Sequence, residues 1–109
     1  MLEMTRRWFG ISSSGAQTAE DGPGLQHSQA ITITAWCDAV ADTAVIGIEH
    51  GWNSTSPFDR LGSTAYSISS GLSVTIQLSG PLRAVRPFVI AKTASTTLVN
   101  IALDGVSGA

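Results

Sequence analysis

Residues 73–78 read Ser-Val-Thr-Ile-Gln-Leu, the cleanest alternation of apolar and polar side chains in the sequence. Successive side chains of a β-strand point to opposite faces, so this rhythm is typical of a strand with one face buried and one face in solvent. Residues 31–37 repeat the pattern, with isoleucine and alanine alternating with threonine and tryptophan. These two segments decide the class of fold, because a helix would require a period of 3.6 residues instead.

Further segments carry weaker strand patterns. They are residues 43–50, 63–70, 84–91 and 97–103. Residues 38–42 contain two aspartates and join two strands of this set, which predicts a turn and a hairpin between 31–37 and 43–50. Pro87 has no backbone N–H to donate, so we expect residues 84–91 to lie at a sheet edge or to contain a bulge.

The N-terminal quarter of the sequence has a different character. Residues 10–28 are small, polar and turn-forming, without a helical or strand period. We therefore predict an N-terminal arm or extended segment over residues 1–28. The remaining residues, 29–109, are expected to form one all-β domain, a single antiparallel β-sandwich or jelly-roll-like fold. A chain of 109 residues has the usual length for one domain.

The composition limits the classes of partner. Charged residues make up 13% of the chain, where an ordinary globular domain has about 25%. The net charge is −2 and the basic residues are scattered, so no cationic stripe is available to neutralise phosphates. Nucleic-acid binding is therefore not expected. A surface with so few charges instead favours contact with another protein.

Membrane insertion and secretion are not expected either. No stretch reaches the roughly 18 apolar residues that a membrane helix requires. The first ten residues contain two arginines but no apolar core of a signal peptide after them. We therefore expect a protein that is made and kept in a cytosol.

No combination of residues points to an active site, a cofactor or a metal. His27 and His50 each lack a second ligand at metal-binding spacing. Cys37 lies in an alternating apolar run, where a buried structural thiol is the usual situation. The serines of residues 12–14 and the acidic pair at residues 20–21 fall in the expected arm, where no base could be held beside them. We expect that the protein is not an enzyme.

The candidate binding residues are large side chains near the N-terminus. Arg6, Arg7, Trp8 and Phe9 place two guanidiniums beside two aromatic rings, and these residue types dominate the energetics of protein interfaces. We expect them to anchor the arm on a partner or a neighbouring subunit. The alternative is that Trp8 folds back onto its own domain.

A second set of aromatic residues lies within the expected domain. Trp36 falls on the face opposite the neighbouring isoleucines, and Trp52 follows a strand in a turn-rich segment. Both are candidate exposed contacts for a partner. Together with Tyr66 they could alternatively form a platform for sugar rings, as in a carbohydrate-binding β-sandwich.

The C-terminal third resembles a known group of proteins in its style of strand and turn. The stretches are residues 73–89, Ser-Val-Thr-Ile-Gln-Leu-Ser-Gly-Pro-Leu-Arg-Ala-Val-Arg-Pro-Phe-Val, and 98–105, Leu-Val-Asn-Ile-Ala-Leu-Asp-Gly. They resemble the C-terminal strands of small virion proteins of tailed bacteriophages, in particular capsid decoration (cement) proteins.

This resemblance implies a β-sandwich, often a homotrimer, on the outer capsid surface of the virion. Such a protein is assembled in the host cytoplasm and clamps neighbouring subunits of the major capsid protein, sometimes through an N-terminal arm. It needs no cofactor, nucleic acid or membrane. The nearest alternative is a phage tail or fibre-attachment module, which would share the architecture and the tendency to oligomerise.

Overall fold

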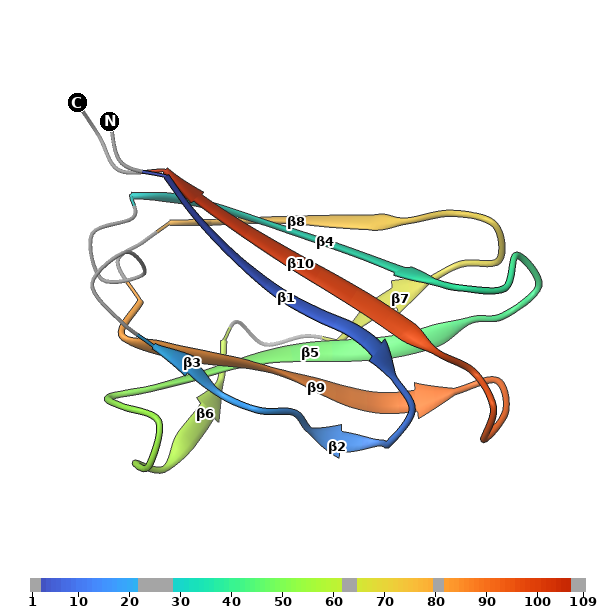
Figure 1. Ribbon diagram of the computed structural model, residues 1–109, viewed down its shortest axis with the longest axis horizontal. Helices are drawn as coiled ribbons and strands as arrows, with labels where there is room; N and C mark the ends of the chain where they lie inside the picture. The colour runs from blue at the N-terminus through green and yellow to red at the C-terminus, as the bar shows by residue number, and fades with distance from the viewer. Residues whose placement is uncertain (1–2, 22–28, 62–64, 80–81, 107–109) are drawn as a thin grey trace.

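A computed structural model describes residues 3–21, 29–61, 65–79 and 82–106 of the chain. These residues form two antiparallel β-sheets that pack face to face, seen as the upper and lower layers of Figure 1. Every regular element within the described residues is a strand. The predicted all-β sandwich is confirmed.

The first sheet, here called sheet A, has four strands in the order β1-β10-β4-β8. Their bounds are β1 Glu3–Ile11, β10 Val99–Val106, β4 Ala30–Cys37 and β8 Val74–Ser79. The two segments with the cleanest alternation, β8 and β4, pair with each other, with Ile33 opposite Ile76 and Thr34 opposite Thr75.

The second sheet, sheet B, is built on the long pair β5 and β9. The bounds are β5 Ala44–Gly51, β9 Ala84–Lys92, β2 Gly15–Ala16, β3 Glu20–Asp21, β6 Phe58–Arg60 and β7 Tyr66–Ile68. The short strands β2 and β3 pair with β9, and β6 and β7 pair with β5. Sheet B therefore has edges made only of two- and three-residue strands.

The core lies between the two sheets and is formed by alternate residues of the long strands. Its fully buried large members include Ile31, Ile33, Ile46, Ile48, Ile68, Ile101, Leu103, Val85, Val89 and Val99. Most of these side chains are β-branched, which suits a pleated surface packed on one face. Sequence alternation thus becomes a two-layer core because each sheet turns its apolar face inward.

The predicted hairpin between residues 31–37 and 43–50 is wrong. β4 lies in sheet A and β5 lies in sheet B, so the connection at residues 38–43 crosses from one layer to the other. Each strand has one face formed mainly by buried apolar side chains, and crossing between layers brings those two faces together. A hairpin would have placed them side by side and left the same apolar surface without a cover.

The prediction of an arm separate from the domain is also wrong for the described part of residues 1–28. Residues 3–11 form β1, which pairs with β10 from Glu3–Val106 to Ile11–Val99. Residues 15–21 then run along β9 as β2 and β3. The segment is extended, as expected, but it is built into both sheets because Met4, Trp8 and Ile11 bury their side chains in the core.

Residues 84–91 do not lie at a sheet edge, but they do contain a bulge, because the register with β5 shifts between Val45 and Ile46 and skips Ile90. The bulge is therefore at Ile90 and not at Pro87. β9 has β5 on one side and the short strands β2 and β3 on the other, so it is not an edge strand. Pro87 pairs with Ile48 of β5 and falls between the residues that pair with β2 and those that pair with β3. The N–H of Gln17 donates a hydrogen bond to the carbonyl oxygen of Pro87 at 2.9 Å. The missing N–H of proline is tolerated because the neighbouring strand is interrupted at that point.

Candidate partner-binding surface

Phe9 lies on the outer face of sheet A at a bulge in β1. The register with β10 shifts between Trp8 and Ile11, and Gly10 has a φ of 66°, a left-handed conformation that favours glycine. The extra residue allows both Trp8 and Ile11 to face the core, with Phe9 pointing outward between them. The bulge therefore determines which aromatic ring is presented to solvent.

A buried amide holds this bulge in place. The side chain of Asn100 in β10 accepts a hydrogen bond from the N–H of Gly10 at 2.9 Å and donates one to Oδ1 of Asp38 at 2.6 Å. Asn100 is buried, so both hydrogen bonds compensate for the loss of water around a polar group. It links β1, β10 and the connection that follows β4.

Phe9 and Trp36 meet on the outer face across β10. Their ring centroids are 5.6 Å apart with an interplanar angle of 61°, an edge-to-face arrangement. The guanidinium of Arg7 lies 6.0 Å from the Phe9 ring centroid. Phe9 is 54% exposed. We name these three residues the Phe9–Trp36 patch.

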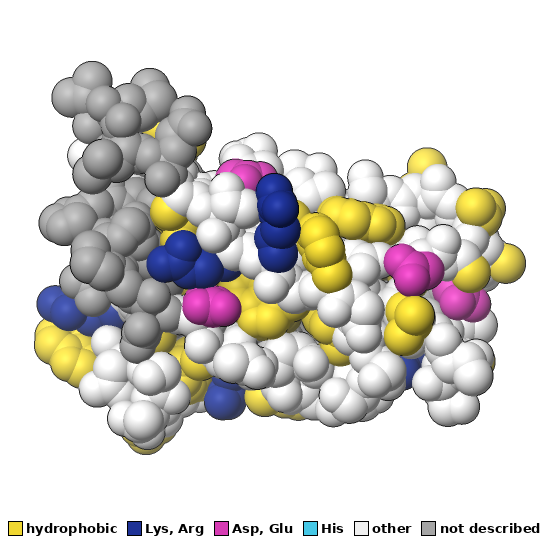
Figure 2. All heavy atoms as spheres, viewed as in Figure 1, with side chains coloured by type: hydrophobic (Ala, Val, Ile, Leu, Met, Phe, Trp, Pro, Cys, Tyr) yellow, Lys and Arg dark blue, Asp and Glu magenta, His cyan; other side chains and the backbone are white. Residues whose placement is uncertain are grey.

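The surface around this patch carries few charges. The outward residues of β4 and β8 are mostly threonine, glutamine and serine, and Thr32 Oγ1 bonds Oε1 of Gln77 at 3.0 Å. Figure 2 shows hydrophobic side chains over the strands of sheet A, with some charged side chains beside them. An exposed aromatic pair on such a face is typical of a protein contact surface.

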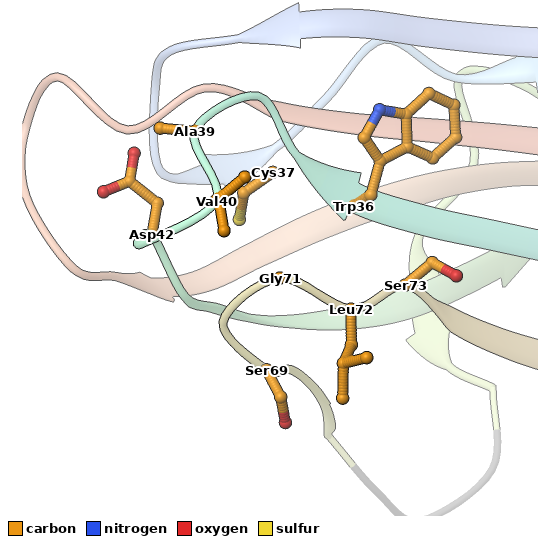
Figure 3. A pocket seen from close by; sticks show the side chains of 9 residues that line it. All are labelled: Trp36, Cys37, Ala39, Val40, Asp42, Ser69, Gly71, Leu72 and Ser73. Atoms are coloured by element: carbon orange, nitrogen blue, oxygen red, sulfur yellow. The ribbon is translucent and has the colours of Figure 1, made fainter.

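A shallow hollow of about 200 Å³ borders the patch at the end of β4. Its lining residues are Trp36, Cys37, Ala39, Val40, Asp42, Ser69, Gly71, Leu72 and Ser73 (Figure 3). In this view the Trp36 ring extends away from the turn that carries Gly71 and Leu72. Val40 is 76% exposed and Leu72 66% exposed, so apolar surface continues from the patch to this end of the sandwich.

The two turns that form the hollow are tied together. The hydroxyl of Ser70 donates to the carbonyl oxygen of Val40 at 2.8 Å. Gly71 has a φ of 73°, and a Cβ there would lie 3.4 Å from a methyl of Val40. The sequence analysis did not identify Val40 or Leu72, because an isolated apolar residue in a turn has no periodic pattern.

Two of the four candidate arm residues contact other residues of their own domain. Trp8 is 8% exposed in the core, and its Nε1 donates to the carbonyl oxygen of Thr18 at 2.7 Å. Arg6 lies on the inward side of β1, where its Nε is 3.6 Å from Oε2 of Glu20. Trp8 is therefore packed in its own domain, as in the alternative that it folds back, and its ring is not exposed to a partner. Arg7 and Phe9 remain exposed, as a partner contact requires.

Trp52 lies far from this surface, beside the opposite end of β5. It is strongly exposed, and the guanidinium of Arg83 is 3.7 Å from its ring centroid. A second hollow of about 420 Å³ borders it, lined by His50, Gly51, Trp52, Pro57, Asp59, Leu82 and Arg83. The proposed sugar platform of Trp36, Trp52 and Tyr66 does not form as one surface, because these rings lie on β4, after β5 and on β7.

The outer face of sheet B carries a charged cluster that the sequence analysis missed. Glu49 of β5 accepts a hydrogen bond from Nε of Arg86 at 2.8 Å and lies 3.9 Å from Nε of Arg60. The Arg86 guanidinium lies 4.2 Å from the Phe58 ring centroid, and that of Arg60 lies 5.2 Å from the Phe88 ring centroid. These five residues are the Glu49 cluster.

Two glycines provide room for the Glu49 cluster. A Cβ at Gly47 would lie 2.6 Å from Nη1 of Arg60, and one at Gly51 would lie 3.3 Å from the Phe58 ring. The signal in the sequence is the i, i+2 spacing of Phe58 with Arg60 and of Arg86 with Phe88. This spacing places each pair on one face of a strand, but the register that brings both to Glu49 is not visible in the sequence.

Cys37 is a protonated structural thiol in this setting. Its partial burial raises the pKa of the thiol above its ordinary value, and the carboxylates of Asp42 and Asp38 raise the pKa further. A raised pKa disfavours the thiolate that nucleophilic chemistry requires. Within the described residues no group of three His, Cys, Asp or Glu side chains could hold a metal ion. His27 lies outside the described residues.

The described residues also contain no helix with the length and hydropathy needed to cross a lipid bilayer.

These features define a two-layer β-sandwich with an exposed aromatic patch on a sparsely charged sheet. No protein-family model and no curated protein sequence matches the chain. Solved structures do match it in fold, and three of them are similar across nearly the whole of this chain.

The similar structures come from different kinds of protein. A subunit of the Bacillus endospore appendages, described as a family of disulfide-linked pili, has a TM-score of 0.51 at 8% identity and covers 97% of this chain and 86% of its own. The mitogen YPM from Yersinia pseudotuberculosis has a TM-score of 0.53 at 8% identity, covering 99% and 88%. The PBSX exported protein XepA has a TM-score of 0.56 at 12% identity, with 99% of this chain matching 38% of that one. At these identities the likeness establishes the fold.

Proposed function

We propose that this protein is a non-catalytic structural component of a bacteriophage particle, a decoration protein that binds the outer capsid surface. Its partner on this proposal is the major capsid protein. The support comes from the exposed patch, the low surface charge and the resemblance of the C-terminal strands to phage virion proteins. The fold is compatible with a structural role, since a subunit of the Bacillus endospore appendages shares it.

The observation that carries the proposal is the Phe9–Trp36 patch. An aromatic ring that is 54% exposed and packed on a second ring is costly to leave in water. Aromatic and arginine side chains are the residues that contribute most to binding energy when a partner covers them. Arg7 beside the rings can supply a charge-assisted hydrogen bond to a carboxylate of the capsid subunit.

The proposed contact would stabilise the capsid through the large number of copies bound to one shell. A small patch binds weakly alone, but many copies on one shell contribute together when each contact exists only on the assembled surface. Binding to the assembled shell and not to its dissociated subunits stabilises the shell by mass action. Cys37 could link at most one pair of copies, so disulfide cross-linking along a fibre is not part of this proposal.

A rebinding assay tests the proposed surface. Purified particles stripped of this protein are mixed with the wild-type chain or with Phe9→Ser and Trp36→Ser variants, and the bound fraction is measured by sedimentation. Each variant is expected to lose at least about tenfold in affinity, as hot-spot aromatic residues do. Trp52→Ser is the matched control, because Trp52 is also exposed and also contacts an arginine. Equal losses for all three variants would reject the patch as the binding site.

Copy number distinguishes the capsid from the tail. A phage tail or fibre-attachment module is the alternative supported by the same fold and the same resemblance. Quantitative mass spectrometry of purified particles is expected to give on the order of hundreds of copies, comparable to the capsid protein, because a shell repeats its subunits by symmetry. A value in the tens would assign the chain to the tail and overturn the capsid role.

One observation favours carbohydrate binding as a second candidate function. Trp52 borders a hollow that also presents the polar side chains of His50, Asp59 and Arg83. A flat ring with neighbouring hydrogen-bonding groups is the arrangement that binds a sugar. A glycan array compares the wild-type chain with Trp52→Ala, and binding that the substitution abolishes would support this function. An array without binding would remove it.

A further inference from the structure

Among the described residues, β8 is the one long strand at a sheet edge that has no feature to prevent pairing with another chain. Within the described residues its backbone pairs only with β4. Its sequence from residue 74 to 79 contains no charge, proline or glycine. Natural edge strands usually carry a lysine, a proline, a bulge or a covering loop, because their free N–H and C=O groups otherwise pair with a further strand.

The other edges of the sandwich are protected. β1, at the opposite edge of sheet A, carries Arg6 and Arg7 and ends in the bulge at Gly10. The edges of sheet B are strands of two or three residues, and these offer too few backbone groups for a stable pairing. In Figure 1, β8 lies on the side of sheet A away from β1, so it is also separate from Phe9.

We propose that β8 pairs antiparallel with β8 of a second copy of this chain, which joins two copies of sheet A into one continuous sheet. The alternation of apolar and polar residues in β8 is the same in both directions from Ile76. A two-fold axis at Ile76 places Val74 opposite Leu78 and Thr75 opposite Gln77 of the other copy. Residues directly opposite each other in an antiparallel pair share a face, so all apolar residues would lie on the core side.

In this register no apolar residue lies opposite a polar residue of the other copy. Shifting the axis by half a residue would put Ile76 opposite Gln77 and turn an apolar side chain to the solvent face. Val74 and Leu78 are partly buried side chains that pack on the core of their own copy, so a second copy of the strand would complete their burial. The polar pair has a precedent within the sheet, since Thr32 and Gln77 are cross-strand partners joined at 3.0 Å.

The absence of charge favours a second copy over a different protein. An interface related by a two-fold axis places each residue near its own counterpart, so any net charge on the strand would repel itself. β8 has none, and the adjacent outward residues Thr32 and Thr34 are also neutral. The result is a dimer, in place of the trimer that the resemblance to decoration proteins implies. This inference does not depend on the proposed capsid role.

A pair of double variants tests both the contact and its register. Thr75 and Gln77 are exposed in the single chain, so substitutions there leave the core intact. In the double variant Thr75→Lys with Gln77→Lys, the axis at Ile76 brings like charges opposite each other twice. In Thr75→Lys with Gln77→Glu, the same axis brings opposite charges together twice, on a strand that also carries two charged residues.

The masses of the three proteins are measured by sedimentation equilibrium over a range of concentrations. The wild-type chain, of 11.3 kDa, is expected to be a dimer. The lysine–lysine variant is expected to dimerise at least about tenfold more weakly, because directly opposed like charges are destabilising in a sheet. The lysine–glutamate variant is expected to remain a dimer, and circular dichroism checks that each variant is folded.

Several results would overturn the proposal. A wild-type monomer, trimer or open-ended polymer would exclude a closed two-fold pairing at β8. A dimer that tolerates the lysine–lysine variant would place the contact elsewhere on the chain. Equal weakening of both double variants would show that the strand pairs in another register.

Discussion

The outer faces of the two sheets differ in how their exposed groups are satisfied. On sheet B, Glu49 lies between Arg60 and Arg86, and each arginine also contacts a phenylalanine ring. On sheet A, Phe9 and Trp36 pack on each other among uncharged side chains and leave much of the Phe9 ring exposed. The charged groups of sheet B form ion pairs with each other, although Nε of Arg60 makes no hydrogen bond, whereas the Phe9 ring of sheet A stays half exposed.

This difference shows that the charged groups and the exposed aromatic rings lie on different faces of this protein. Arginine is common in protein interfaces, and three arginines lie on or beside sheet B. Their guanidiniums are occupied by Glu49 and by aromatic rings, so a partner would have to compete with these contacts. The sheet with few charges offers apolar surface and an open backbone edge instead, and neither requires an existing contact to break.

The largest effect is expected in β1, the strand that carries Phe9 and Arg7 of the patch. If β1 is an integral part of sheet A, Trp8→Ala should lower the free energy of unfolding by about 3–5 kcal/mol, as large aromatic truncations in a core do. The loss includes the hydrogen bond from Nε1 to Thr18, which connects β1 to the segment before β3. Urea denaturation followed by circular dichroism measures it.

Phe9→Ala is the matched control for Trp8→Ala, because the two residues are adjacent and face opposite sides of the sheet. It removes an exposed edge-to-face contact, which is worth about 0.5–1.5 kcal/mol. If the two substitutions destabilised the protein equally, the division of β1 into a core face and a contact face would not hold.

A smaller effect is expected from breaking the Glu49 cluster. The Glu49 side chain is 12% exposed, and those of Arg60 and Arg86 are 34% and 29% exposed. Glu49→Gln should destabilise the protein by about 1–3 kcal/mol, less than for a fully buried pair because water screens the arginines. Thermal unfolding of this variant is compared with that of Asp59→Asn, an exposed position on β6 that should change little. If Glu49→Gln left the stability unchanged, the ion pairs of the Glu49 cluster would not stabilise sheet B.

The smallest effect concerns Cys37, at the boundary of the Phe9–Trp36 patch. Because burial and two carboxylates raise the pKa of its thiol, the folded chain should react with iodoacetamide more slowly at neutral pH than the urea-unfolded chain. The folded state holds the proton more tightly, so this group's contribution to stability is complete below the unfolded pKa and is lost as the pH rises through the folded pKa. The rate of alkylation as a function of pH measures the pKa of the thiol in each state, since the chain has one cysteine. A folded midpoint at or below the unfolded one would contradict the assignment.

The sequence was most informative where a strand has one buried face. The segments at β4 and β8 were predicted nearly to the residue, and the weaker patterns at β5, β9 and β10 were also strands. β1 was missed because arginines interrupt its alternation and its bulge breaks the period before Ile11. The short strands β2, β3 and β6 were missed because two or three residues cannot show a period.

The candidate surface was predictable only in part. Phe9 was predicted as an anchor of the arm on a partner, and Trp36 as an exposed aromatic contact. Nothing in the sequence indicated that they meet, since they lie on β1 and β4 with β10 between them. The Glu49 cluster was missed for the same reason. Its members belong to β5, β6 and β9, and only the pairing registers of these strands bring them together.

The amino-acid order by itself determined that the chain would form strands, because the side of a strand that each residue occupies follows from the two-residue repeat of the backbone. Tertiary structure alone decided which strands share a sheet, which places Trp8 in the core beside the exposed Phe9 and sends β4 and β5 into different layers. The physical reason is that alternation specifies a buried face but not the surface that covers it. That choice depends on which packing of all the faces together leaves the least apolar area in water.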